Sequence, residues 1–66
     1  MKLNEKVKYL REEKGFTQVG IAEILGMSRG AYSNYEIGKR TPDVYTLKKI
    51  ADILGVTVDD LLSGEL

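Results

Sequence analysis

The sequence has 66 residues, with ten basic and ten acidic side chains and neither cysteine nor histidine. A chain of this length is expected to form one domain over residues 1–66, with no disulfide or zinc site to stabilise its small core. The absence of histidine and cysteine also removes the common general base near neutral pH and the thiolate nucleophile. The composition therefore predicts a protein that is not an enzyme and uses no metal or cofactor.

The zero net charge conceals an uneven distribution along the chain. Residues 1–49 hold all ten basic and six acidic side chains, a balance of +4, whereas residues 50–66 carry −4. This distribution predicts that one end of the domain faces an anionic partner. The first six residues already include charges, and no apolar run approaches the ~20 residues of a membrane helix, which predicts a cytoplasmic protein without signal peptide or membrane partner.

Five helices are expected, and no alternating apolar pattern indicates strands. The first four cover residues 4–14, 18–25, 29–37 and 44–54, and a short last helix follows residue 57. Each predicted start has a polar side chain that can accept from a free backbone N–H, and glycines stand at the first four ends. These caps are Asn4, Thr17, Ser28, Asp43 and Thr57, the last of which forms a capping box with Asp60.

Residues 17–37, TQVGIAEILGMSRGAYSNYEI, read as two short helices joined by a three-residue turn. A turn of this kind containing glycine is typical of a DNA-reading helix-turn-helix. On the second helix, Tyr32 and Tyr35 share the face that packs. The opposite face carries the predicted base contacts, which are Arg29, Gly30, Ser33 and Asn34.

The residue types on that face suit base edges in the major groove. An arginine can bond both guanine acceptors, an asparagine can pair with adenine, and a serine serves either. Gly30 offers only its backbone, and its missing side chain lets the helix approach the groove closely; a glycine tolerated in a frayed first turn explains it equally well. The predicted phosphate contacts, which flank this face in sequence, are Thr17, Gln18, Lys39 and Arg40.

From Leu10 to Leu62 the chain resembles the phage-repressor and Cro-like family of helix-turn-helix domains, also called the Xre family. The resemblance rests on Leu10-Arg11, Phe16-Thr17-Gln18, Ile21-Ala22-Glu23, Leu25-Gly26, Met27-Ser28-Arg29, Ser33-Asn34-Tyr35-Glu36, Gly38-Lys39-Arg40 and Leu54-Gly55-Val56. It implies a compact, all-α, lambda-repressor-like domain that binds double-stranded DNA sequence-specifically. Such a domain is expected to be a transcriptional regulator, in the first place a repressor, and to bind a palindromic operator as a homodimer.

The same resemblance assigns roles to residues outside the reading face. It implies an ion pair between Arg11 and Glu36, and a Gln18 that braces Arg29 against a base. It also implies a dimer surface near the turn between the last two helices, at Ile53, Val56 and Val58. The residues alone leave another pairing open, because Glu36 also has Lys39 and Arg40 three and four positions later.

Two other functions stay open. Apolar residues at Val19, Ile24 and Ile37, where exposed positions are expected, favour an antitoxin-like or adaptor module whose main partner is another protein. The chain can also be the DNA-binding end of a longer regulator. No small-molecule ligand is indicated by the sequence.

Overall fold

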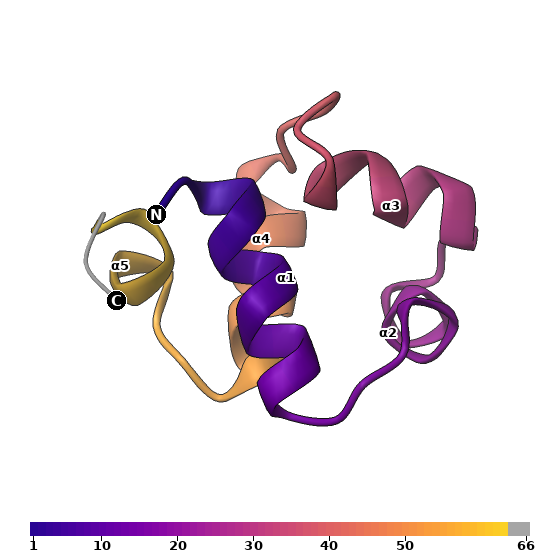
Figure 1. Ribbon diagram of the computed structural model, residues 1–66, viewed down its shortest axis with the longest axis horizontal. Helices are drawn as coiled ribbons and strands as arrows, with labels where there is room; N and C mark the ends of the chain where they lie inside the picture. The colour runs from indigo at the N-terminus through magenta and orange to yellow at the C-terminus, as the bar shows by residue number, and fades with distance from the viewer. Residues whose placement is uncertain (64–66) are drawn as a thin grey trace.

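The computed structural model describes residues 1–63 and folds them into five α-helices (Figure 1). The helices are α1 (Leu3–Glu13), α2 (Gln18–Leu25), α3 (Arg29–Glu36), α4 (Val44–Leu54) and α5 (Val58–Leu62). Within these 63 residues there is no strand. The predicted all-α fold of five helices is confirmed, and α2 and α4 begin and end at the predicted residues.

One cluster of buried apolar side chains holds the five helices together, and every helix contributes to it. Tyr32 and Tyr35 lie in this cluster with their rings edge to face, 6.2 Å apart and at 89° to each other. The α3 face that carries them is therefore the packing face, as predicted. The full cluster is Val7, Ile21, Ala22, Tyr32, Tyr35, Leu47, Ile50, Ala51, Leu54 and Leu61.

The turn between α2 and α3 has the expected chemistry. Gly26 has a φ of +72°, in the left-handed region that glycine adopts without strain. Its N–H bonds the Glu23 carbonyl, and the next N–H bonds the Ala22 carbonyl, both at 3.0 Å, which closes α2. Ser28 then accepts from the N–H of Ala31 at 3.1 Å and starts α3. Glycine and serine thus set the direction in which α3 leaves α2.

The predicted N-cap of the first helix is wrong by two residues. Lys2, not Asn4, is the N-cap of α1, and its backbone N–H donates to the Glu5 carboxylate at 2.9 Å. Asn4 lies inside the helix, and its Nδ2 donates to the Glu36 carbonyl at 3.2 Å. A contact across 32 residues thus outcompetes the local preference of asparagine for a cap. At the other end, α1 stops at Glu13 with Lys14 as its C-cap.

The short helix α5 is attached to α1 by a buried lysine. Lys6 is fully buried, and its Nζ donates to the Asp60 carbonyl at 2.9 Å and to Ser63 Oγ at 3.4 Å. The positive charge of Lys6 also interacts favourably with the partial negative charge at the C-terminal end of α5, where backbone carbonyl groups lack helical partners. At the other end of α5, Thr57 and Asp60 form the predicted capping box.

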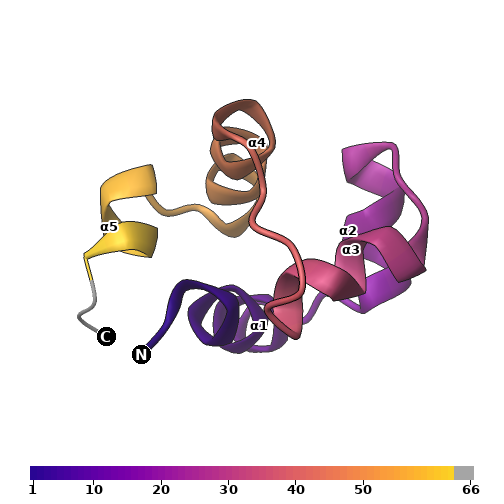
Figure 2. The same cartoon turned by 90° about the horizontal axis from the view of Figure 1, so that it is seen from above.

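The two views agree on where the ends of the domain lie. α5 and the N-terminus lie at one end, and α2 and α3 lie at the other, with α1 and α4 between them (Figures 1 and 2). Asp59 and Asp60 of α5 are therefore far from the reading helix. Over the part of the chain that the structure describes, none of the helices has the length and apolar character needed to cross a membrane.

Candidate nucleic-acid interface

The face of α3 that points away from the core carries the predicted base-contact residues. Arg29 and Gly30 are exposed, and Ser33 and Asn34 are half-buried. Ser33 Oγ donates to the Gly30 carbonyl at 3.0 Å, which leaves the lone pairs of its oxygen able to accept from a base. A Cβ added at Gly30 would meet no atom within 4 Å, so packing inside the chain does not require glycine there. The absent side chain leaves open surface beside Arg29.

A basic loop follows the reading helix and is fixed by the helix end. The Asn34 carbonyl accepts from the backbone N–H groups of Lys39 at 2.9 Å and Arg40 at 3.2 Å. Both side chains are exposed. The backbone of the loop is therefore held while its two cationic side chains remain available to phosphates.

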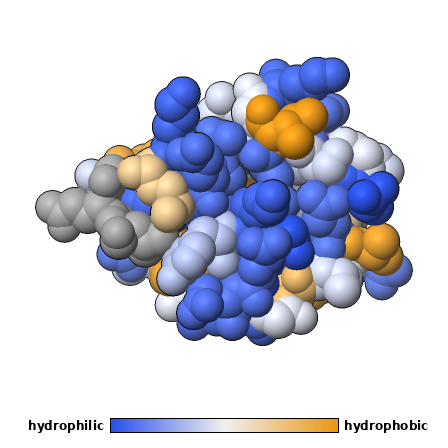
Figure 3. Space-filling model, in the orientation of Figure 1, coloured by the Kyte–Doolittle hydropathy of each residue, from blue (hydrophilic) through white to orange (hydrophobic). Residues whose placement is uncertain are grey.

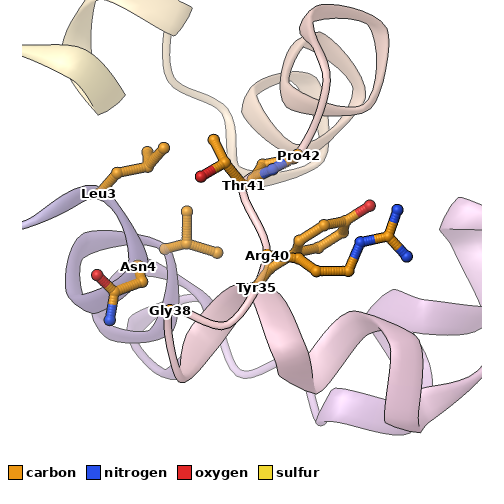
Figure 4. A pocket seen from close by; sticks show the side chains of 8 residues that line it. Leu3, Asn4, Tyr35, Gly38, Arg40, Thr41 and Pro42 are labelled. Atoms are coloured by element: carbon orange, nitrogen blue, oxygen red, sulfur yellow. The ribbon is translucent and has the colours of Figure 1, made fainter.

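A small cleft of about 100 Å³ lies between this loop and the start of α1, and Arg40 lines it (Figure 4). In Figure 4 the Arg40 guanidinium points away from Leu3 and Asn4. Its aliphatic stem therefore packs on the domain while its charge remains at the surface.

Thr17 and Gln18, the predicted phosphate contacts on α2, already have partners inside the domain. Thr17 Oγ1 accepts from the Gly20 N–H at 2.9 Å, which leaves its own O–H free to donate to a phosphate. Gln18 Nε2 donates to Glu36 Oε1 at 3.0 Å. In the free domain Gln18 thus contacts Glu36, the last residue of α3, and its implied role of bracing Arg29 against a base stays a prediction.

The Glu36 carboxylate joins three helices at the base of this interface. Arg11 Nε lies 2.6 Å from Oε2 and Arg11 Nη2 lies 3.2 Å from Oε1, so α1 is tied to α3 by a two-pronged ion pair. The Tyr32 hydroxyl donates to Oε2, and Gln18 of α2 donates to Oε1. The Glu36 side chain is 1% exposed. Of the alternatives that the sequence left open, the structure has the pair with Arg11 and not pairs with Lys39 or Arg40.

The surroundings of Glu36 determine the protonation of the cluster. Burial acts to raise the pKa of the Glu36 carboxyl, but hydrogen bonds from Arg11, Tyr32 and Gln18 together hold that pKa below its ordinary value. Burial and the bond to Glu36 raise the pKa of the Tyr32 phenol. The bond to Glu36 also raises the pKa of the Arg11 guanidinium. The cluster thus holds one carboxylate, one cation and one neutral phenol donor at neutral pH.

The lowered carboxyl pKa values give the free energy of unfolding a predictable pH dependence. The pKa values of Glu36, Asp43 and Asp60 lie below their ordinary values of 4.5, 3.8 and 3.8. Their contribution is complete above the ordinary values and is lost as the pH falls through the values in the folded protein. We expect the denaturant midpoint to be constant from about pH 8 to 5 and to fall below that. A transition between pH 6 and 8 would contradict this expectation, since the chain has no histidine.

Three apolar side chains that the sequence places at exposed positions are exposed in the structure. Val19, Ile24 and Ile37 are 51%, 58% and 61% exposed, as the unusual pattern of the sequence indicated. The face shown in Figure 3 is mostly hydrophilic, with small hydrophobic areas separated by polar surface. Scattered apolar side chains of this kind are ordinary on a monomer surface, so they add little to the adaptor hypothesis.

Two of the three predicted dimer residues, Val56 and Val58, line a groove at the α4–α5 turn. Ile53, Val56 and Val58 are half-buried and pack partly against the core. The groove has a volume of about 440 Å³ and is lined by Lys48, Asp52, Val56, Thr57, Val58 and Asp59. Val56 and Val58 give the groove apolar surface, whereas Lys48, Asp52 and Asp59 give it charges of both signs.

The sequence does not predict the contacts of Lys6, beside α5, and Asn4, beside the end of α3. Lys6 reads as an ordinary solvated lysine, and nothing in its spacing marks the bond to Asp60. Asn4 was assigned to a cap, although it braces the end of α3. Both contacts join positions more than 30 residues apart, so only the tertiary fold reveals them.

Comparisons with known proteins give a consistent family. Over 60 residues the chain is 48% identical to the SPbeta prophage-derived uncharacterized HTH-type transcriptional regulator YonR of Bacillus subtilis, covering 91% of this chain and 56% of that protein. The chain spans 56% of the length of that protein and 53% and 32% of two other curated relatives that it matches.

Two solved structures have the same fold. The P22 c2 repressor, solved in complex with a synthetic operator, superimposes with a TM-score of 0.89 at 23% identity, covering 98% of each chain. SinR, described as the master regulator for biofilm formation and solved in complex with DNA, superimposes with a TM-score of 0.81 at 30% identity, covering 89% of this chain and 95% of that one. The helix-turn-helix family model matches residues 7–61. The chain belongs to the Cro/C1-type helix-turn-helix family.

Proposed function

We propose that this domain is a sequence-specific transcriptional regulator that reads the major groove of double-stranded DNA with α3. The observation that carries the proposal is the exposed polar face of that helix, whose opposite face is locked into the core by Tyr32, Tyr35 and Glu36. A rigid helix that presents arginine, serine and asparagine side chains on one face is suited to base readout. The SinR likeness supports DNA as the partner, since that protein was solved in complex with DNA.

The domain acts by binding alone, in the cytoplasm and without a cofactor. Arg29, Gly30, Ser33 and Asn34 face the bases in this proposal. Thr17, Gln18, Lys39 and Arg40 contact the phosphates on either side, which sets the register of the helix in the groove. A regulator that only occupies its site blocks other proteins from it, so repression is the simplest outcome.

Selection from random duplexes tests this function directly. The purified protein is expected to enrich one family of sites, with an affinity that falls steeply as salt is raised, because bound phosphates release counterions. A domain whose real partner is a protein would retain no duplex at moderate salt in the presence of non-specific competitor. That outcome would favour the adaptor hypothesis over DNA reading.

We also propose that two copies bind one operator through Ile53, Val56 and Val58. One small module makes only a few base contacts, and a two-fold dimer doubles them. The half-sites should then be centred about 34 to 36 Å apart, one helical turn of DNA. Three small aliphatic side chains form a slight interface, so we expect the free protein to be mostly monomeric.

Val58→Asp is expected to separate dimer formation from folding. Val58 is the first residue of α5, where an acidic side chain suits the helix dipole and offsets part of the packing lost against the core. Circular dichroism measures the fraction that stays folded. A charge in the shared surface should weaken binding to the palindromic site by at least about tenfold, since like charges meet across the two-fold axis. Binding to an isolated half-site should change little. Footprints that cover one half-site only, with no dyad in the selected sequences, would contradict the dimer.

A further inference from the structure

The side chain of Gln18, at the edge of the proposed interface, is bonded to the buried carboxylate of Glu36. It is half-buried at the first position of α2, and one N–H of its amide is bonded to Glu36 Oε1 at 3.0 Å. A glutamine amide has two N–H donors in one plane, so fixing the first also fixes the direction of the second. Among the described residues, no other hydrogen bond to the Gln18 side chain is present.

Glu36 is an unusually rigid acceptor for such a bond. Its side chain is 1% exposed, and its two oxygens also receive Arg11 from α1 and Tyr32 from its own helix. None of the buried polar side-chain atoms in the described residues lacks a partner, so this network is complete without DNA. The fold of the free domain therefore holds Glu36 in place without a ligand.

We infer that Glu36 is a positioning residue for DNA binding, whose carboxylate holds the Gln18 amide so that its second N–H is already directed at a phosphate. This inference rests on the proposed function of the domain. Ordering a free side chain on binding costs affinity, and a side chain ordered beforehand avoids that cost. The ion pair that joins α1 to α3 thus also prepares a contact at the start of α2.

The dynamics of the free parent protein give the first test, and a variant is needed only to assign one signal. Gln18 is the only glutamine in the sequence, so its side-chain amide can be identified in an NMR spectrum by one substitution. We expect this amide to be nearly as rigid as the helical backbone, with an order parameter near about 0.85. A value below about 0.6 in the free protein would overturn the positioning role, whatever the variants do.

A double-mutant cycle on DNA affinity gives the second test, at low temperature and with the folded fraction measured by circular dichroism. Gln18→Ala should weaken binding to the selected site by about tenfold, the effect of a lost hydrogen bond to a charged group. Glu36→Gln offers one carbonyl oxygen to the donors of Arg11, Tyr32 and Gln18, so it should release Gln18 and weaken binding by about two- to tenfold. In the Gln18→Ala background, Glu36→Gln should weaken binding no further.

Glu23→Gln is the charge-matched control, because Glu23 is exposed on α2. The change in DNA affinity that Glu23→Gln causes measures how much of the change caused by Glu36→Gln comes from the loss of one negative charge. Losses that add in the double variant would show that Glu36 acts only through the fold. If Gln18→Ala binds as well as the parent, Gln18 makes no phosphate contact and the inference fails while DNA binding stands. Only a parent protein that retains no duplex would remove the proposed function itself.

Discussion

Arg11→Met should lower the free energy of unfolding by about 3 to 5 kcal/mol, because it leaves the Glu36 carboxylate buried without its cation. The Glu36 side chain is 1% exposed, and that of Arg11 is 9% exposed. Methionine fills much of the space of the arginine side chain, so the decrease in the free energy of unfolding comes from the missing charge rather than from lost packing. For a domain of this size each kcal/mol moves the melting temperature by about 4 to 8 °C, so thermal melting should begin at least about 12 °C lower.

The matched control is Lys48→Met, which removes the same kind of charge from an exposed pair. Lys48 Nζ lies 2.6 Å from Asp52 Oδ1, but both side chains are more than 60% exposed. Such pairs contribute at most about 1 kcal/mol. Adding Glu36→Met to Arg11→Met should recover part of the lost stability, since no unpaired charge then remains buried. An Arg11→Met variant that melts within about two degrees of the parent would show that the pair does not stabilise the fold.

Much of the fold could be predicted because its signals are local. Thr17, Ser28, Asp43 and Thr57 are caps within three residues of the N–H groups that they accept from, and each is found where expected. The stop at Gly26 follows from a backbone conformation that glycine alone adopts without strain. Features of this kind need only a short window of sequence.

What could not be predicted lies in contacts between distant positions. Asn4 has the right chemistry for a cap, yet the carbonyl of Glu36 at the end of α3 receives its amide instead. Nothing in the residues around Gln18 indicates that its amide bonds Glu36 at the end of α3. In both cases the amide of the side chain could donate to several carbonyl or carboxylate oxygens, and only the packing of α1, α2 and α3 determines which oxygen it reaches.

The roles of Arg29 and Lys39 in DNA binding should differ in kind as well as in size. Arg29 is exposed at the start of α3, where its side chain can reach a guanine edge, whereas Lys39 lies in the loop after the helix. Arg29→Ala is expected to cost about 1 to 3 kcal/mol on the selected site and to relax the choice of base at one position per half-site. Lys39→Ala should weaken binding to all sequences alike, and it should flatten the plot of log affinity against log salt by about one unit per site engaged.

Affinities at three salt concentrations, on the selected operator and on its single-base variants, separate these two outcomes. Lys8→Ala is the charge-matched control, because Lys8 is exposed on α1 and lies outside the proposed interface. It should change neither the base preferences nor the salt slope by a comparable amount. Should Arg29→Ala flatten the salt slope while the base preferences stay intact, Arg29 would be a phosphate contact. Base readout would then rest on Ser33 and Asn34, the two half-buried polar side chains further along the same face.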